Sequence, residues 1–277
     1  MSVDHYENFP VASLLLPASL RPAVDAIYRW ARCADDIADE GEFAPQDRLV
    51  RLQAMDQDLD RIGAGSSALE PITAELAPHI GRHALPIQAF HDLLSAFSQD
   101  VGTARYADFA GLSDYCRRSA NPIGRLMLHL YRAAQLAHLD HSDAICTGLQ
   151  LTNFWQDVAI DWHKARVYLP QDDCARFGIA DRDIARFCAG DSINPAWREL
   201  MQFELDRARA LLKSGAPLAR ALPGRIGLEL ALVIQGGLRI LERIEAVEGD
   251  VFRHRPTLRA RDWSLMLLRA VHSKVAP

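Results

Sequence analysis

Hydrophobic residues recur at helical spacing along nearly the whole chain, and the alternating runs that are typical of β-strands are almost absent. Ser19 followed by Pro22 is typical of a helix start, and this helix is expected to end near Glu40. The same periodicity predicts helices at about residues 45–62, 72–79, 86–99, 112–118, 122–138, 141–162, 181–189, 195–214 and 225–248. Loops are predicted at residues 63–67, 166–173 and 190–194. The pattern therefore indicates an all-α fold.

No internal repeat, low-complexity tract or linker interrupts this pattern, so we expect residues 1–277 to form a single all-α domain. Hydrophobic residues make up 49% of the chain, which is enough for a sizeable core. No run of about 18 uncharged apolar residues occurs, so a membrane-spanning helix is not expected. The first residues include two acids and no basic cluster, which argues against a signal peptide.

Charge, cysteine usage and missing motifs narrow the range of functions. The net charge of −5 is mild and no basic block is present, so nucleic acid is not an expected partner. The five cysteines are scattered and form no CxxC pair, which argues against a disulfide framework or a zinc site and for a reducing, cytoplasmic compartment. No GxSxG, P-loop or GxGxxG pattern occurs, so hydrolase, NTPase and dinucleotide-binding functions lack support.

A first acidic cluster, Asp35, Asp36 and Asp39, lies in the segment ARCADDIADE. On a helix all three carboxylates can share one side, where like charges cost a few tenths of a kcal/mol per pair. Hard oxygen donors in this arrangement suit Mg²⁺, which binds through one or two carboxylates together with substrate phosphates. A solvated acidic face is the alternative, because Glu40 and Glu42 follow directly.

A second cluster, Asn153, Asp157 and Asp161, lies in QLTNFWQDVAIDW, with Gln150 about one turn earlier. Steps of four keep these residues on one stripe of a helix. The surrounding residues are apolar nearly all round the helix, which favours burial. Buried carboxylates are costly unless they are paired or bound to metal. Metal ions held by two such clusters would bind a diphosphate and stabilise its departure, leaving a carbocation that requires a dry apolar cavity.

Basic side chains adjoin both clusters. Arg32 precedes Asp35 by three positions on the same helical face, and Lys164 and Arg166 follow Asp161. At these positions they can reach phosphate oxygens, although surface salt bridges are the alternative explanation for each.

A run of small residues, Ser119, Ala120 and Gly124, lies in YCRRSANPIGRL, which begins at Tyr115. Beside Pro122, this run suits either close contact between helices or the wall of a cavity that holds a prenyl chain. The sequence leaves both interpretations open.

Three motifs together resemble the squalene/phytoene synthase family: ARCADDIAD (Ala31–Asp39), YCRRSANPIG (Tyr115–Gly124) and QLTNFWQDVAIDWHKARVYLP (Gln150–Pro170). The resemblance covers nearly the whole chain. It implies an isoprenoid-synthase helical bundle around a central cavity. It implies that Mg²⁺ is bound by Asp35, Asp36, Asp39, Asn153, Asp157 and Asp161, with the aspartates as catalytic residues. It also implies that the substrate is contacted by Ser13, Tyr28, Arg32, Tyr115, Ala120, Gln150, Lys164, Arg166 and Arg255.

Within that family, the opening segment ENFPVASLLLP is similar to members that act in bacterial hopanoid biosynthesis. The resemblance implies that presqualene diphosphate ionises, that the cation rearranges, and that water captures it to give hydroxysqualene and pyrophosphate. It implies functional pairing with a presqualene diphosphate synthase and peripheral contact with the inner membrane. The chain departs from the family pattern at Ala165, where glycine is usual.

Two alternatives follow from the same resemblance. A sister enzyme that condenses two prenyl diphosphates would make presqualene diphosphate, dehydrosqualene or phytoene. A non-catalytic assembly factor on this fold is the alternative of another class, but such proteins typically lose the aspartates, and both clusters are intact here.

Overall fold

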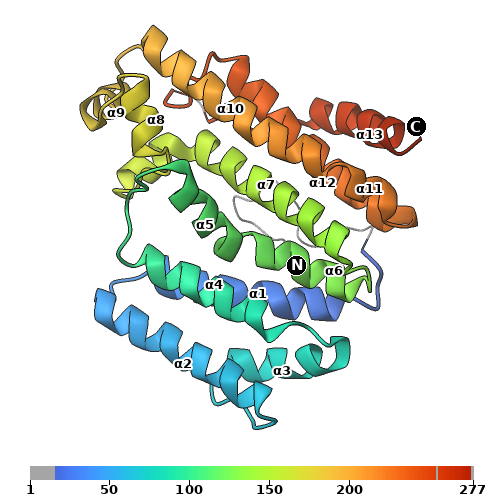
Figure 1. Cartoon of the computed structure of the whole chain (residues 1–277). Coiled ribbons are helices and arrows are strands. Elements are labelled where there is room, and N and C mark those ends of the chain that lie inside the picture. Colours follow the sequence, from blue (N-terminus) through green and yellow to red (C-terminus); the bar gives the residue numbers. More distant parts are fainter. Residues whose placement is uncertain (1–15, 254, 276–277) are drawn as a thin grey trace. The chain divides into compact units, whose positions relative to one another are not determined.

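The structure, a computed structural model, describes residues 16–253 and 255–275, and every named element in these ranges is a helix (Figure 1). The all-α prediction is therefore confirmed. In chain order the helices are α1 (Arg21–Asp39), α2 (Pro45–Gly63), α3 (Pro71–His83), α4 (Ile87–Asp100), α5 (Phe109–Ser119), α6 (Asn121–Leu130), α7 (Leu136–His163), α8 (Gln171–Arg176), α9 (Asp181–Cys188), α10 (Pro195–Gly215), α11 (Pro217–Ala221), α12 (Gly224–Glu245) and α13 (Ala260–Val275).

Most predicted helix starts lie close to the observed ones because proline occupies the first turn of α1, α2, α3, α6 and α10. The predicted helix over residues 122–138 is wrong at its end, since α6 stops at Leu130. Arg132 adopts a φ of 56° there. The N–H groups of Arg132 and Ala133 donate to the carbonyls of His129 and Leu128, which closes the helix without a glycine or proline.

Three helices were not predicted. The helices α8 and α11 span only 6 and 5 residues, which is too short for a periodic pattern to reveal, and α8 begins inside the predicted loop 166–173. The helix α13 is 16 residues long, but apolar residues occur on both its buried and its exposed sides, which weakens the helical period.

The described chain divides into two compact units. The first unit comprises residues 16–103 and 115–143, and the second comprises residues 104–114 and 144–275. The chain passes between the units at residues 103–104, within α5 and within α7. The expectation that residues 1–277 form one domain stays a prediction.

Trp30 of α1 organises the core of the first unit. Its side chain is fully buried, and its indole N–H donates to Thr73 Oγ1 of α3 at 3.1 Å. Its ring meets the ring of Phe90 of α4 edge to face, with centroids 5.1 Å apart. One aromatic side chain thus fixes α1 against two other helices of this unit.

Glycines allow three helices of the second unit to approach closely. A Cβ atom at Gly148 of α7 would lie 2.9 Å from Leu212 Cγ of α10. A Cβ atom at Gly237 of α12 would lie 2.8 Å from Leu149 Cδ2 of α7. A Cβ atom at Gly148 would also lie 3.1 Å from the backbone N of Leu212, so this glycine is needed for the packing of α7 against α10. At Gly237 the flexible end of the Leu149 side chain would have to move.

None of the helices within residues 16–253 and 255–275 combines the length and the apolar character needed to cross a bilayer.

Candidate functional site

The packing of α1 decides where the first acidic cluster lies. The buried residues of this helix follow one another at intervals of three or four and turn one face to the core: Ala23, Ile27, Trp30, Ala34 and Ala38. Asp35, Asp36 and Asp39 lie on the remaining surface and are half-buried. The sequence prediction that the three residues share one helix is therefore met by the geometry.

Arg32 pairs with two of these carboxylates. Its Nη1 lies 3.2 Å from Asp35 Oδ2, and its Nη2 lies 2.7 Å from Asp36 Oδ1. Burial alone would lower the pKa of Arg32, but the charges of Asp35 and Asp36 outweigh that effect and raise the pKa. The Oδ1 atom of Asp36 is buried and makes no hydrogen bond of regular geometry, so this ion pair balances its charge.

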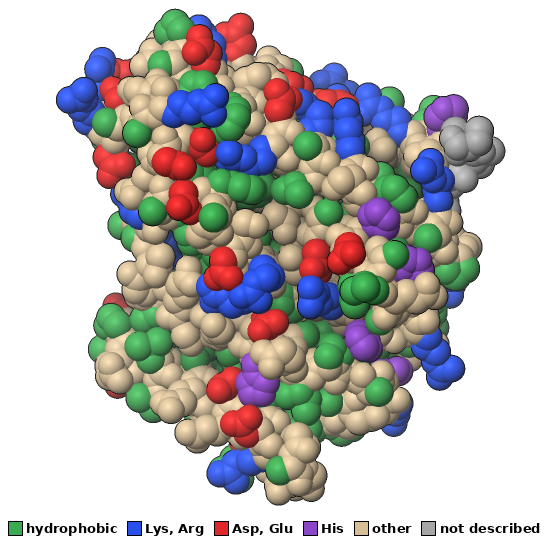
Figure 2. Space-filling model, viewed as in Figure 1, with side chains coloured by type: hydrophobic (Ala, Val, Ile, Leu, Met, Phe, Trp, Pro, Cys, Tyr) green, Lys and Arg blue, Asp and Glu red, His purple; other side chains and the backbone are tan. Residues whose placement is uncertain are grey.

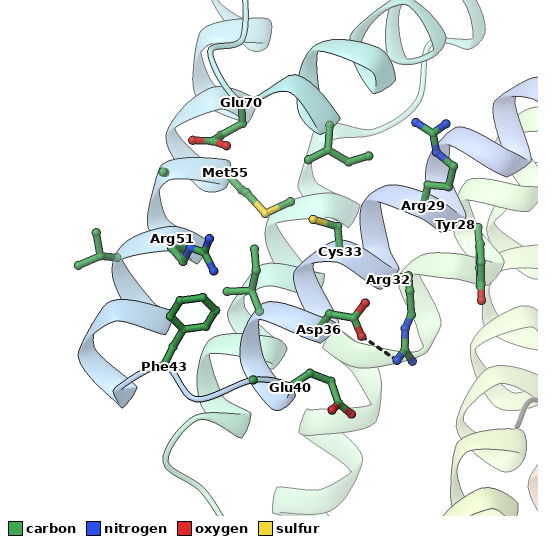
Figure 3. Close-up of a pocket in the computed structure, with 15 residues that line it drawn as sticks. Tyr28, Arg29, Arg32, Cys33, Asp36, Glu40, Phe43, Arg51, Met55 and Glu70 are labelled. Carbon is green, nitrogen blue, oxygen red and sulfur yellow. Dashed lines mark ion pairs between the residues drawn. The ribbon is translucent and has the colours of Figure 1, made fainter. Parts of the chain in front are cut away.

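A pocket of about 890 Å³ opens beside this cluster, between α1, α2 and the start of α3 (Figure 3). Tyr28, Arg32 and Asp36 line it, whereas Asp35 and Asp39 do not. Figure 3 shows Cys33 of α1 and Met55 of α2 pointing toward each other inside the pocket. Its volume is typical of small-molecule sites, and it combines an apolar wall with a charged rim.

The second cluster lies on one stripe of α7. Asn153, Asp157 and Asp161 are half-buried, and the buried side of the helix is formed by Leu151, Phe154, Trp155 and Val158. The expected apolar surroundings are therefore present, although the acids themselves keep partial access to water.

Asp157 is bound by an arginine from a distant part of the sequence. Arg255 lies 98 positions later and donates from Nε to Oδ1 and from Nη2 to Oδ2, the second bond at 3.0 Å. Both side chains are 21% exposed. Two parallel N–H···O⁻ bonds are the strongest arrangement that arginine makes with a carboxylate. The resemblance implied that Arg255 contacts phosphate, but no sequence signal predicted its contact with Asp157.

Two neighbours of Asp157 hold α7 in place. The side-chain amide of the buried Gln156 donates to the carbonyl of Pro256, next to Arg255. The indole N–H of Trp155 donates to the backbone carbonyl of Glu204 of α10 at 3.1 Å. These contacts fix both the helix and the loop that carries Arg255. Gln156 was missed by the sequence analysis, and its only signal is a polar residue on an otherwise apolar helix face.

Glu204, whose backbone carbonyl accepts the bond from Trp155 of α7, belongs to a cluster of charged residues with Asp173 and Arg207. Arg207 Nη1 contacts Glu204 Oε2 and Asp173 Oδ2, each at 2.9 Å. Burial raises the pKa of Glu204 to about 8, and the nearby Asp173 adds to this rise while Arg207 opposes it. Glu204 therefore keeps its proton to a higher pH than an exposed glutamate does.

The backbone at the end of α7 shows why glycine is usual at the position of Ala165. The N–H of Arg166 donates to the carbonyl of Asp161 at 2.8 Å, and the N–H of Ala165 donates to the carbonyl of Trp162 at 2.9 Å. This is a Schellman motif, which places the residue after the helix in the left-handed region. Ala165 has a φ of 60°, a conformation that costs a non-glycine residue about 1 kcal/mol. The motif fixes the backbone of Arg166 next to Asp161.

The other implied contact residues are more dispersed. Tyr115 is buried, and its hydroxyl donates to Asp100 Oδ2 at 2.8 Å, a partner that the sequence analysis missed. Ala120 and Gln150 are half-buried, and Lys164 is exposed. Ser13 and most of the segment ENFPVASLLLP lie outside the described residues.

The donor set fits Mg²⁺ in chemistry. Carboxylate and amide oxygens stand on consecutive turns of α1 and of α7, and the Asp36 oxygen described above has an incomplete set of partners. Within residues 16–253 and 255–275, no three His, Cys, Asp or Glu side chains form a preformed metal cluster. Such a donor set suits an ion that takes one or two carboxylates and completes its coordination with water and phosphate.

A model of the squalene/phytoene synthase family matches residues 3–262. The chain belongs to the squalene/phytoene synthase family. The resemblance inferred from the three motifs is thereby confirmed. The members of this family process prenyl diphosphates in isoprenoid biosynthesis. This chain is therefore an enzyme that processes a prenyl diphosphate.

Two relatives show the range of reactions in the synthase family. The hydroxysqualene synthase of Zymomonas mobilis is 35% identical over 231 residues, which cover 82% of this chain and 75% of the relative. The phytoene synthase of Arthrospira platensis is 31% identical over 268 residues, which cover 92% of this chain and 85% of the relative.

Solved structures of the synthase family share the fold. The squalene synthase HpnC from Alicyclobacillus acidocaldarius matches with a TM-score of 0.80 at 35% identity, over 88% of this chain and 90% of that chain. A dehydrosqualene synthase in complex with a ligand matches with a TM-score of 0.79 at 19% identity, over 93% of this chain and 88% of that chain. At that identity the second match supports the fold alone.

Proposed function

We propose that this protein is a hydroxysqualene synthase, a carbon–oxygen lyase that ionises presqualene diphosphate with Mg²⁺ and captures the rearranged cation with water. The observation that carries the proposal is that both acidic motifs are intact and that each presents a carboxylate in direct contact with an arginine. Carboxylates for a divalent cation and guanidinium groups for phosphate oxygens are the two kinds of group that diphosphate departure requires.

Each motif would contribute ligands for Mg²⁺: Asp35, Asp36 and Asp39 on α1, and Asn153, Asp157 and Asp161 on α7. When bound, Mg²⁺ supplies positive charge that stabilises the departing pyrophosphate. Because each motif carries its own arginine, a phosphate that binds at either motif meets a guanidinium there. Arg32 and Arg255 would orient the diphosphate and hold the pyrophosphate after the bond to carbon has broken.

The chemistry balances without a reductant. The carbon–oxygen bond to the diphosphate breaks, and its electron pair leaves with pyrophosphate. The cyclopropylcarbinyl cation rearranges, the oxygen of one water forms a bond to carbon, and that water loses a proton to solvent. The products are hydroxysqualene and pyrophosphate. Exclusion of all other nucleophiles decides this outcome, because the cation reacts with the first one that reaches it.

Water capture is favoured over other outcomes by the relatives. Hydroxysqualene synthases of Zymomonas mobilis, Rhodopseudomonas palustris and Sinorhizobium fredii match at 31–35% identity over 82–86% of this chain. The phytoene synthase matches support a second candidate, a sister enzyme that condenses two prenyl diphosphates. A non-catalytic assembly factor lacks a comparable observation in its favour, since both motifs are complete.

The proposed substrate also places the enzyme in a reaction sequence. Presqualene diphosphate must come from an enzyme that condenses two C15 prenyl diphosphates, so we propose functional pairing with a presqualene diphosphate synthase. Both enzymes would act in the cytoplasm.

A labelling experiment tests the proposed reaction. Purified protein would be incubated with presqualene diphosphate and Mg²⁺ in H₂¹⁸O, without NADPH. We expect a C30 alcohol that carries ¹⁸O, and we expect that added NADPH does not convert the product to squalene. The matched reaction in ordinary water should give the same alcohol without the label.

Substrate controls separate the two candidates. Farnesyl diphosphate alone should give little C30 product. Efficient conversion of farnesyl diphosphate to presqualene diphosphate, or of geranylgeranyl diphosphate to phytoene, would overturn the proposed reaction in favour of the condensing sister enzymes.

A further inference from the structure

The exposed side of α13 is apolar. Trp263, Leu267 and Val271 follow one another at intervals of four, with Leu268 beside them, and their exposed fractions are 44%, 48%, 45% and 72%. No other helix in the described part of the chain has more than one large hydrophobic side chain that is exposed to this degree. Contiguous exposed apolar surface of this kind marks a contact surface. We call these four residues the α13 stripe.

Ion pairs hold α13 in this orientation. Asp262, Met266 and Ala270 form a second series at intervals of four, and all three are buried. Arg239 Nε and Arg243 Nη1 of α12 each lie 2.8 Å from the Asp262 carboxylate. Burial alone would raise the pKa of Asp262, but the Arg259 amide and these two guanidinium groups hold it at about 2. The α13 stripe is therefore exposed by the packing of the helix and is not a loosely attached segment.

The charge around the α13 stripe is positive, although the whole chain has a net charge of −5. Arg259 and Arg261 are exposed at the start of the helix. Asp262 is the only acidic residue of α13, and it is buried and paired. Glu242 of α12, which contacts Arg269 of α13, is also paired with Arg239.

Other basic side chains adjoin this region. Lys213 and Arg220 line a pocket of about 250 Å³ that also contains Ser273 of α13. Figure 2 shows Lys and Arg side chains gathered over the part of the surface where Figure 1 labels α12 and α13. These basic side chains of α10 and α11 lie near the end of α13 on its packed side, so the positive charge at the α13 stripe itself comes from Arg259 and Arg261.

We propose that α13 docks this protein onto the surface of an anionic lipid bilayer. Trp263, Leu267, Leu268 and Val271 would enter the boundary between headgroups and acyl chains, and Arg259 and Arg261 would contact lipid phosphates. An apolar helix face with flanking basic residues is typical of helices that lie in the membrane interface, and tryptophan favours that depth.

Charge complementarity decides between lipid and a second copy of this chain. Two copies that met through α13 would bring two positively charged surfaces together, whereas an anionic bilayer supplies the opposite charge. This surface goes beyond the proposed reaction, because vesicle binding requires no substrate. It also suits an enzyme whose substrate and product carry long prenyl chains.

Vesicle co-sedimentation tests the docking surface. Full-length protein would be mixed with vesicles of equal parts phosphatidylglycerol and phosphatidylcholine, and with vesicles of phosphatidylcholine alone. We expect stronger binding to the anionic vesicles and a decline of that binding as salt is raised. Leu268→Asp should weaken binding at least about tenfold, because it replaces an inserting apolar side chain with a charge.

Matched variants isolate the surface. Leu69→Asp is the control for Leu268→Asp, because Leu69 is 70% exposed but lies between α2 and α3. The double variant Arg259→Glu, Arg261→Glu should weaken binding to anionic vesicles about tenfold or more, while Arg182→Glu on the exposed surface of α9 should leave it unchanged. Circular dichroism melting would confirm that each variant folds.

Three results would overturn the proposal: a wild-type protein that does not bind anionic vesicles, α13 variants that bind as the wild type does, or a dimer in sedimentation velocity that Leu268→Asp dissociates. Failure here leaves the proposed reaction standing, since turnover of detergent-dispersed substrate is measured separately. Conversely, a protein that binds vesicles but does not ionise presqualene diphosphate would contradict only the proposed reaction.

Discussion

In α1, Asp35 and Asp36 share the guanidinium of Arg32, which lies three and four residues earlier on the same helix, whereas in α7 Asp157 pairs with Arg255, 98 residues away. In the first pairing, 43% of the Arg32 side chain is exposed. In the second, the side chains of Arg255 and Asp157 are each 21% exposed. The first therefore requires only that α1 forms. The second requires that a distant loop is folded onto α7.

Each acidic motif needs a positive charge beside it. The first motif receives it from the same helix, and the second receives it through the tertiary fold. A local pair is readable from the sequence as an i, i+3 or i, i+4 spacing. A tertiary pair is supported by contacts that have no local signal, such as the bond from Gln156 to the Pro256 carbonyl. We therefore expect the two motifs to be similar in their effect on catalysis and different in their effect on stability.

Loss of a carboxylate from either motif should have the largest effect. We expect Asp36→Ala and Asp157→Ala each to lower the rate at least about a hundredfold, as removal of a major electrostatic group does in other active sites. The rate would be measured as pyrophosphate release at saturating Mg²⁺. Asp60→Ala, at an exposed acid of α2, is the matched control and should leave the rate unchanged. A motif whose alanine variant retains the full rate would have no catalytic role.

Removal of the arginines should separate the motifs by stability. Arg255→Ala should lower the free energy of unfolding by about 1.5–3 kcal/mol, because it breaks two charge-assisted hydrogen bonds in a half-buried site. Arg32→Ala should cost less than about 1 kcal/mol, as exposed ion pairs do. Urea unfolding of both variants measures the difference. Equal losses would contradict the distinction between a local and a tertiary pairing.

The same two positions should affect pyrophosphate binding alike. Arg32→Lys and Arg255→Lys keep the charge but lose the planar fork that binds two phosphate oxygens. We expect pyrophosphate to inhibit both variants more weakly than it inhibits the wild type. Unchanged inhibition in either variant would reduce that arginine to a counter-ion of its aspartate.

The contribution of Glu204 to the stability of the protein should depend on pH. In the folded protein the pKa of Glu204 is about 8, whereas its ordinary value is 4.5. Glu204 therefore binds its proton more tightly in the folded protein than in the unfolded chain. Since the native state then holds more protons than the unfolded state, the free energy of unfolding should fall as pH rises from about 4.5 to about 8. Glu204 faces Asp173 and Arg207, so its titration reports on that buried group.

A neutral analogue tests this dependence. Glu204→Gln should flatten the fall in stability over that pH range, whereas Glu199→Gln, at an exposed position of α10, should not. Denaturant unfolding at several pH values is the measurement. An unchanged slope in Glu204→Gln would show that another group is responsible.

The smallest effect is expected at the end of α7. Ala165→Gly should raise the free energy of unfolding by about 0.5 kcal/mol, because glycine adopts the left-handed conformation without strain but loses more chain entropy on folding. Ala159→Gly, the same change within α7, should lower it by about 1 kcal/mol. Effects of the same sign would contradict the Schellman geometry at Ala165.

The sequence predicted most of the helices and the shared helical surface of Arg32, Asp35 and Asp36. Prolines in first turns marked helix starts, and steps of three and four placed Arg32, Asp35 and Asp36 on one surface. What it could not predict depends on tertiary contacts or on unusual backbone. The break after Leu130 depends on the positive φ of Arg132, and the Asp157 pairing depends on a loop placed by the fold. The helix α13 escaped prediction because its exposed side is as apolar as its buried side.

Release of pyrophosphate from presqualene diphosphate tests the proposed function most directly. The purified protein should release pyrophosphate with Mg²⁺ present, stop when EDTA is added, and recover when Mg²⁺ is restored in excess. Asp36→Ala and Asp157→Ala should both fail to release it at a comparable rate. Undiminished release in EDTA would contradict the role of the two motifs as Mg²⁺ ligands. A folded protein that releases no pyrophosphate from presqualene diphosphate under any of these conditions would contradict the proposed function itself.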